Sequence, residues 1–292
     1  MYELIQISEN DYYIDCPSKI GIVKTAGNNV VLIDSGSDRG TGKIVLKTLE
    51  NEGMKVQSIL LTHSHADHIG GNRIIQERTG CKIFAAGIET AYANFPVLEP
   101  FTLYGSFPLP ELRCKFLEAQ QSDVSMLTDE YLPQGMRAVS LKGHTCDMTG
   151  YITADGTFYI GDSLASEENL QKHPVTFITD VAQYLDTLEH LQDVDSKHFV
   201  PSHAPVYTDI RHIVKHNIDK VNFIANRIYI MCKQPKTFET LLENLMDSYR
   251  IPGSAVQHCL IGSTLKSYLN YLLDMKKIEY TFEGASMLWK TL

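Results

Sequence analysis

A histidine-rich turn at residues 62–68 constrains this chain more than any other part of its sequence. The apolar residues 58–61 just before it predict a buried β-strand, and residues 70–79 after it predict an amphipathic helix. The turn holds three histidines and one aspartate in the spacing H-x-H-x-D-H: His63, His65, Asp67 and His68. Because His63 and His65 are two positions apart at a strand end, their side chains can share one face, and the two later donors can reach the same cavity from the turn.

The side chains of this turn are metal donors. Imidazole and carboxylate groups suit borderline divalent transition metals such as Zn²⁺. A single catalytic metal must keep a coordination position open for substrate, so it would not take all four donors of this turn. The spacing therefore indicates two metals. The alternative, a polar loop that is rich in histidine by chance, accounts less well for so specific a spacing.

Further donors follow predicted strands later in the chain, and with them the sequence resembles the metallo-β-lactamase-fold hydrolases. That family carries H-x-H-x-D-H after a strand and then a distant histidine, a distant aspartate and a final histidine, all at strand ends. The matching residues here are His144 in Lys-Gly-His-Thr, Asp162 in Ile-Gly-Asp-Ser and His203 in Pro-Ser-His-Ala. Asp34, in Ile-Asp-Ser-Gly, matches the family's first motif, and the resemblance covers about residues 1–208.

The resemblance implies an α/β fold, the αββα sandwich of this family, and a complete set of ligands for two metals. The implied sets are His63, His65 and His144 for the first metal, Asp67, His68 and His203 for the second, and Asp162 as a bridge between them. Three neutral imidazoles with an open fourth position also make a catalytic zinc-type site on chemical grounds alone. Zn²⁺ is the expected metal, and Fe or Mn is compatible with the same donors.

Two aspartates have expected roles beside metal binding. Asp67 is the candidate catalytic residue, because it can orient the nucleophile or pass a proton to the leaving group. Asp34 is predicted to accept hydrogen bonds that orient the histidine turn. The alternative for Asp34 is a helix cap or a turn residue, which aspartate before Ser-Gly often provides.

Length and charge predict two domains. The chain has 292 residues, of which 43% are hydrophobic, and a net charge of −9, which argues against general adhesion to nucleic acid. Residues 1–208 hold 15 Lys and Arg against 27 Asp and Glu, a balance of −12, and we predict a hydrolase domain there. Residues 209–292 hold 11 against 8, a balance of +3, and we predict a separate helical domain.

The cysteines and the amino terminus bear on the cellular compartment. The six cysteines lie far apart without a C-x-x-C motif, which is typical of reduced thiols. Cys146 is expected to pack beneath the metal site and not to bind metal. The amino terminus lacks the basic and apolar regions of a signal peptide, and no apolar run approaches the length of a membrane span. We therefore predict a cytoplasmic protein without a membrane partner.

Two segments are candidates for substrate contact. Residues 94–110 are rich in aromatic residues and proline, which predicts a loop that acts as a lid or pocket wall, or equally a dimer contact or a satellite core. Tyr104 in this segment is a candidate substrate contact. Lys172, in the polar segment after Asp162, is a candidate contact for an anionic group, unless it is simply solvated. His173, His190 and His198 are weaker candidates.

The chain after residue 208 predicts helices and a final hairpin. Apolar spacing predicts helices over residues 209–231, 238–249 and 264–275, and strands over residues 278–281 and 286–290. This order resembles a winged-helix module, in which Lys266, Lys276 and Lys277 would be phosphate contacts. The nearly balanced charge favours a packing or interaction module instead.

The donors predict a metal-dependent hydrolase, and the resemblance is greatest to cytoplasmic family members without an assigned substrate and to glyoxalase-II-like thioesterases. The first hypothesis is hydrolysis of a small-molecule ester, thioester or lactone. The second is an RNA phosphodiesterase resembling lactamase-like endoribonucleases, with nucleic acid as an open but disfavoured partner. A mononuclear-iron oxidoreductase is less consistent with the full donor set. Antibiotic hydrolysis is less consistent with the missing export signal. The sequence leaves open whether the protein forms a homo-oligomer.

Overall fold

Apolar strands form two β-sheets in the computed structural model, which describes residues 2–292. The first sheet has seven strands in chain order: β1 (Glu3–Gln6), β2 (Asp11–Asp15), β3 (Ile20–Lys24), β4 (Asn29–Ile33), β5 (Lys55–Leu60), β6 (Lys82–Ala85) and β7 (Val124–Met126). Strands β1–β4 pair antiparallel, and β4–β7 pair parallel. The second sheet has the order β11-β10-β9-β8, with the bounds β8 (Arg137–Ser140), β9 (Thr149–Ile152), β10 (Thr157–Gly161) and β11 (His198–Pro201).

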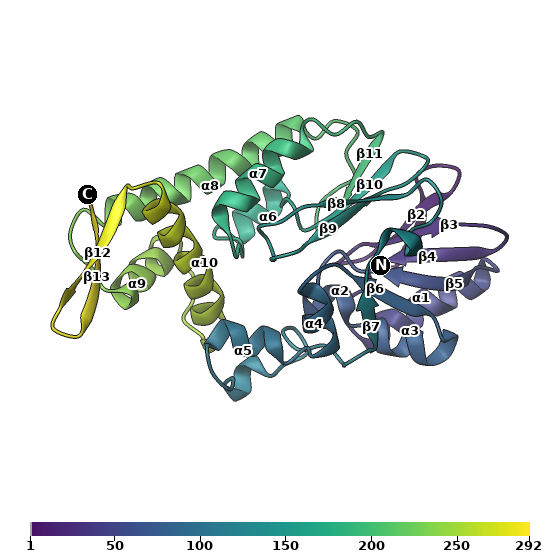
Figure 1. Cartoon of the computed structure of the whole chain (residues 1–292), viewed down its shortest axis with the longest axis horizontal. Coiled ribbons are helices and arrows are strands. Elements are labelled where there is room, and N and C mark those ends of the chain that lie inside the picture. The colour runs from purple at the N-terminus through teal and green to yellow at the C-terminus, as the bar shows by residue number, and fades with distance from the viewer. Residues whose placement is uncertain (1) are drawn as a thin grey trace.

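The two sheets stack face to face, and helices cover their outer faces (Figure 1). In β4, Val31 and Ile33 face the second sheet, where they share a core with Tyr151 and Tyr159. The alternate β4 positions face the other way, into a core with the first helices, because side chains alternate across a strand. The helices around the sandwich are α1 (Arg39–Asn51), α2 (Ala66–Ile69), α3 (Asn72–Thr79), α4 (Glu89–Asn94), α5 (Leu98–Tyr104), α6 (Glu167–Lys172) and α7 (Val181–Leu191). The prediction of an αββα sandwich is confirmed.

After the sandwich the chain forms helices and a hairpin. These elements are α8 (Arg211–Met231), α9 (Phe238–Ser248), α10 (Ala255–Asp274), β12 (Ile278–Glu283) and β13 (Ser286–Thr291). One hydrophobic cluster joins Phe158 and Ile160 of the second sheet to Leu265 and Leu269 of α10, so the carboxy-terminal helices share a core with the sandwich. The winged-helix relation of this segment stays a prediction. Within residues 2–292 no helix has the length and apolar character needed to cross a bilayer.

Three predicted segments differ from the structure. The predicted helix over residues 70–79 is present as α3 but begins two residues later, and the short helix α2 precedes it, with Gly70 and Gly71 between the two helices. A Cβ on Gly70 would lie 2.4 Å from the backbone of Ser37, so the close approach of the loop after β4 requires glycine there. Helix α10 begins at residue 255 and not 264, because the Ser254 side chain caps it by accepting from the Gln257 N–H at 3.1 Å.

The third difference is in residues 94–110, which contain helix and not only a loop. Pro100 lies in the first turn of α5, where its missing N–H is tolerated. Leu103 packs in a small core with Leu112, Leu117 and Cys259 of α10. This arrangement is the satellite core that the sequence analysis gave as an alternative.

Candidate metal centre

Asp34 fixes the histidine turn to the first sheet. It ends β4 with a φ of 65°, a left-handed conformation that is unusual for a residue other than glycine. Its Oδ1 accepts from the Thr62 N–H at 2.7 Å, and its Oδ2 accepts from the Thr62 hydroxyl at 2.7 Å and from His68 Nδ1 at 2.9 Å. These three bonds hold the strained backbone in place. The structure therefore places Asp34 as an acceptor beside the turn, where the sequence analysis expects it.

The hydrogen bonds around the histidines set which ring nitrogen faces inward. Because the Thr62 hydroxyl donates to Asp34, it accepts from His63 Nδ1 at 3.0 Å. His144 Nδ1 donates to the Phe177 carbonyl at 3.0 Å, and His203 Nδ1 donates to the Pro17 carbonyl at 2.6 Å. With Nδ1 as the donor, the Nε2 atom of each ring faces into the site, and in the neutral ring this atom carries the lone pair that a metal binds. In metal centres, the ring nitrogen of a ligand histidine that faces away from the metal typically makes such a hydrogen bond.

Three imidazoles meet at one point to form the first donor group. His65 Nδ1 lies 3.1 Å from His63 Nε2 and 3.1 Å from His144 Nε2. Burial lowers the pKa of His63 and of His144, and it lowers the pKa of His65 to about 3. All three rings are therefore neutral at pH 7, with nitrogen atoms close together. Three lone pairs in this arrangement fit a bound cation.

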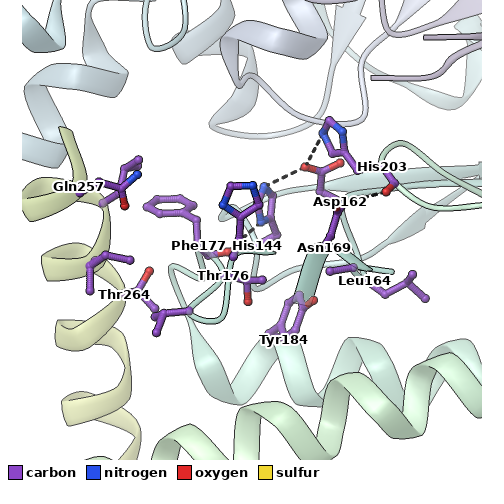
Figure 2. A pocket seen from close by; sticks show the side chains of 15 residues that line it. His144, Asp162, Leu164, Asn169, Thr176, Phe177, Tyr184, His203, Gln257 and Thr264 are labelled. Carbon is purple, nitrogen blue, oxygen red and sulfur yellow. Dashed lines mark hydrogen bonds and ion pairs between the residues drawn. The ribbon is translucent and has the colours of Figure 1, made fainter. Parts of the chain in front are cut away.

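The second donor group lies next to the first, and Figure 2 shows Asp162 between His144 of the first group and His203 of the second. His203 Nε2 lies 3.1 Å from Asp67 Oδ2, and His68 Nε2 lies 3.6 Å from the same oxygen. Asp162 reaches both groups, since its carboxylate oxygens lie 3.4 Å from His68 Nε2, 3.5 Å from His144 Nε2 and 3.3 Å from His203 Nε2. Asp162 Oδ1 is buried and has no hydrogen-bond partner within residues 2–292.

The electrostatics of this second group also fit a cation. Burial opposes a charge on His203, but the Asp162 carboxylate outweighs it and raises the pKa of His203 to about 10. In the same way, Asp67 and Asp162 raise the pKa of buried His68. In this group protons on the histidines compensate the negative charge of the two carboxylates, and a divalent cation would compensate the same charge.

Both sheets contribute donors to this centre. His63, His65, Asp67 and His68 follow β5 of the first sheet. His144 follows β8, Asp162 follows β10 and His203 follows β11, which are strands of the second sheet. The seven predicted donors therefore meet at one edge of the sandwich, where strand ends of both sheets lie together.

Glu89 and Ser18 hold this centre in place, and the sequence analysis did not identify either. Glu89 on α4 is 3% exposed, and it accepts from the Ser64 N–H at 3.0 Å and from the Asp147 N–H at 3.2 Å. Ser18 is also 3% exposed, and its hydroxyl donates to Asp67 Oδ2 at 2.8 Å. Neither residue lies in a recognisable motif, because their contacts come from segments distant in sequence.

Replacing Glu89 with alanine is expected to destabilise the protein and weaken metal binding. The change leaves the buried Ser64 N–H and Asp147 N–H without acceptors, which costs about 2–4 kcal/mol of unfolding free energy. Since Ser64 lies between His63 and His65, zinc affinity should fall roughly 10- to 100-fold. Urea unfolding and zinc titration would measure both effects.

Glu77→Ala is the matched control for this prediction, because Glu77 is exposed and pairs only with Arg73 on its own helix. It should change the unfolding free energy by less than about 0.5 kcal/mol. Equal stability and zinc affinity in Glu89→Ala and the parent protein would show that Glu89 does not support the turn.

A cleft of about 380 Å³ opens beside the donors. Figure 2 shows His144, Asp162 and His203 along one side of it and Gln257 and Thr264 of α10 on the other. A smaller recess of about 80 Å³ lies across Phe177, which lines both cavities. The Phe177 ring packs edge-on against His65, with 5.4 Å between the ring centroids.

Several predicted residues lie outside the cleft. Tyr104 is 42% exposed and lines a separate depression with α9 and α10, because Leu103 occupies the buried face of α5. Lys172 is the last residue of α6, is exposed, and does not line the cleft, whereas its neighbour His173 does. Cys146 is exposed at the small recess and does not pack beneath the donors, which corrects that expectation.

Comparison with known proteins places these features in a family. A hydroxyacylglutathione hydrolase from Photobacterium profundum is 29% identical over 54% of this chain and 48% of its own length. An atrochrysone carboxyl ACP thioesterase from Aspergillus fumigatus is 24% identical over 90% of this chain and 78% of its own length. The chain thus spans about half of the first relative's length.

Solved structures share the fold over nearly the whole chain. A beta-lactamase domain protein from Burkholderia ambifaria has a TM-score of 0.74 at 15% identity, over 99% of this chain and 94% of its own. The family model described as "Metallo-beta-lactamase superfamily" matches residues 13–203, a range that includes all seven donors. The chain belongs to the metallo-beta-lactamase superfamily.

Proposed function

We propose that this protein is a dinuclear metal-dependent hydrolase of small-molecule esters, thioesters or lactones. The observation that carries the proposal is the convergence of seven donors, with three neutral imidazoles in one group and two carboxylates around the other. Names of relatives such as the hydroxyacylglutathione hydrolase and the thioesterase support acyl substrates. Zinc is the proposed metal, because the donors are nitrogen and oxygen atoms in a site that neutral histidines dominate.

The residues of this chain divide the work of hydrolysis. When bound, two divalent ions supply a hydroxide at neutral pH and stabilise negative charge on the substrate oxygen. His63, His65 and His144 would hold one ion, Asp67, His68 and His203 the other, and Asp162 would contact both.

Asp67 and Tyr184 are the residues placed to handle protons and substrate. Burial opposes ionisation of Asp67, but the charge of His68 outweighs it and lowers the pKa of the Asp67 carboxyl. Asp67 is therefore an acceptor that can orient an attacking water, and its side chain is 40% exposed at the open side of the centre. Tyr184 lines the cleft, and its hydroxyl can donate to a substrate oxygen.

Metal analysis tests the proposal. Protein purified without chelator is expected to contain about two metal ions per chain, measured by elemental analysis. Removal of the metals should abolish thioester hydrolysis, and added Zn²⁺, Mn²⁺ or Fe²⁺ should restore it. Full activity in the chelated sample would overturn the proposal. One iron and no second metal would instead favour an oxidoreductase on this fold.

A further inference from the structure

Away from the metal donors, the walls of the cleft are apolar or neutral. Five aliphatic side chains line it: Leu164, Ala165, Val175, Leu260 and Ile261. Neutral hydrogen-bonding groups come from Asn169, Thr176, Tyr184, Gln257 and Thr264. Tyr184 is 3% exposed and lines the cavity, so its hydroxyl is a buried group that can donate to a neutral acceptor there. A wall of this kind accommodates a hydrocarbon chain with an occasional neutral acceptor.

No lysine or arginine lines the cleft or the smaller recess in the described part of the chain. Lys19 lines neither cavity, and its ammonium donates to the Ala204 carbonyl at 2.8 Å. Lys142 pairs with Asp147 at 3.0 Å. Burial lowers the pKa of His173 at the cleft rim, so this imidazole is neutral at pH 7. The recess instead contains two acidic residues, Glu89 and Glu99.

Away from the donor groups, an anionic part of the substrate would therefore lie in either cavity without a lysine or arginine as a positive partner. Moving a carboxylate out of water without a partner is costly, and nearby acidic groups add repulsion. The net charge of −12 on residues 1–208 also disfavours an anionic substrate at longer range. These conditions differ from what an enzyme for an anionic thiol ester would need.

We infer that the substrate is an uncharged ester or thioester whose apolar chain lies in the cleft along α10. This inference rests on the proposed function and names its substrate class. Helix α10 is then the specificity-determining element, with Gln257 and Thr264 on the wall opposite the donors and Leu260 and Ile261 also lining the cleft.

Matched thioesters test the inference on the full-length, metal-loaded protein. The three substrates are the hexanoyl and adipoyl thioesters of N-acetylcysteamine and hexanoyl glutathione. The first is neutral, the second adds a carboxylate to the acyl chain, and the third adds carboxylates to the thiol. We expect kcat/KM for the neutral thioester to exceed that for each charged one by about 100-fold or more.

The outcomes separate the two proposals. A charged thioester that is hydrolysed as well as the neutral one would overturn the inference and leave the metal-dependent hydrolase in place. Failure to hydrolyse all three thioesters, together with p-nitrophenyl hexanoate, would overturn the proposed function and the inference with it.

A positive or a negative charge introduced at Gln257 of α10 tests where the acyl chain of the substrate binds. Gln257→Arg should raise the charged-to-neutral ratio of kcat/KM about 10-fold, and Gln257→Glu should lower it. His258→Arg is the control, because His258 is the next residue but lines the separate depression with Tyr104. The control should leave the ratio unchanged. An unchanged ratio in both folded Gln257 variants, checked by thermal unfolding, would show that the chain binds elsewhere.

Discussion

Replacing Asp162 with asparagine is expected to lower kcat/KM for the neutral thioester by about 1,000-fold. Asp162 is the carboxylate that lies within 3.5 Å of ligand nitrogens in both donor groups. Asparagine has nearly the same shape but no charge, so the site would lose much of the negative charge that a second cation needs. The bound metal should fall from about two ions to about one per chain. Elemental analysis and steady-state kinetics on the same sample would measure both changes.

Asp209→Asn is the matched control for this prediction. Asp209 is exposed and pairs with Arg211, away from the donors, so its variant should keep the parent metal content and rate. Two tightly bound metals in Asp162→Asn, with kcat/KM within about 10-fold of the parent, would contradict the role of Asp162 between the two groups.

Replacing Gly143 with alanine is expected to destabilise the metal-free protein by about 3–5 kcal/mol. Gly143 has a φ of 119°, which residues with a Cβ rarely adopt. A Cβ there would lie 2.2 Å from the backbone nitrogen of Tyr184. The Gly143 carbonyl also accepts from the N–H groups of Thr179 and Asp180 at 2.9 and 3.0 Å, so the start of α7 would have to move.

Urea unfolding of the chelated protein would measure this change without a contribution from metal binding. The control is Gly253→Ala, because a Cβ at Gly253 would meet open space and its φ is not positive. It should change the unfolding free energy by less than about 1 kcal/mol. Because His144 follows Gly143, we also expect weaker metal binding in Gly143→Ala. A loss below about 1 kcal/mol would show that the loop adapts to the larger residue.

The sandwich and the gathering of the donors could be predicted from the sequence, because both depend on local patterns. Residues 58–61 form a continuous apolar run, and the observed strand β5 covers Lys55–Leu60. The donors follow strands, and strand ends that lie at one edge of a sandwich bring distant residues together. His144, Asp162 and His203 are separated by tens of residues in sequence, but each follows a strand of the same sheet.

The supports of the centre and its cleft could not be predicted in this way. Glu89 contacts Ser64 from a helix that begins 25 residues later, and the contact depends on how α4 packs on the first sheet. The sequence predicts this helix only from residue 264, whereas the observed α10 begins at Ala255. The reason is that Gly262 and Thr264 lower the helix propensity in its interior. Tertiary packing overrides that local preference. Because the first turns of α10 are missing from the prediction, its cleft-lining residues Gln257, Leu260 and Ile261 are not identified from the sequence.

The position of α10 also bears on how proteins of this superfamily diverge. The family model ends at residue 203, whereas the helical wall of the cleft comes from residues 257–264. The stretch that the family model covers and the stretch that would select the substrate are therefore separate in the chain. Mutations in α10 could change substrate preference during evolution while every metal donor stays constant. Common descent in the first stretch would then coexist with a different substrate in each lineage.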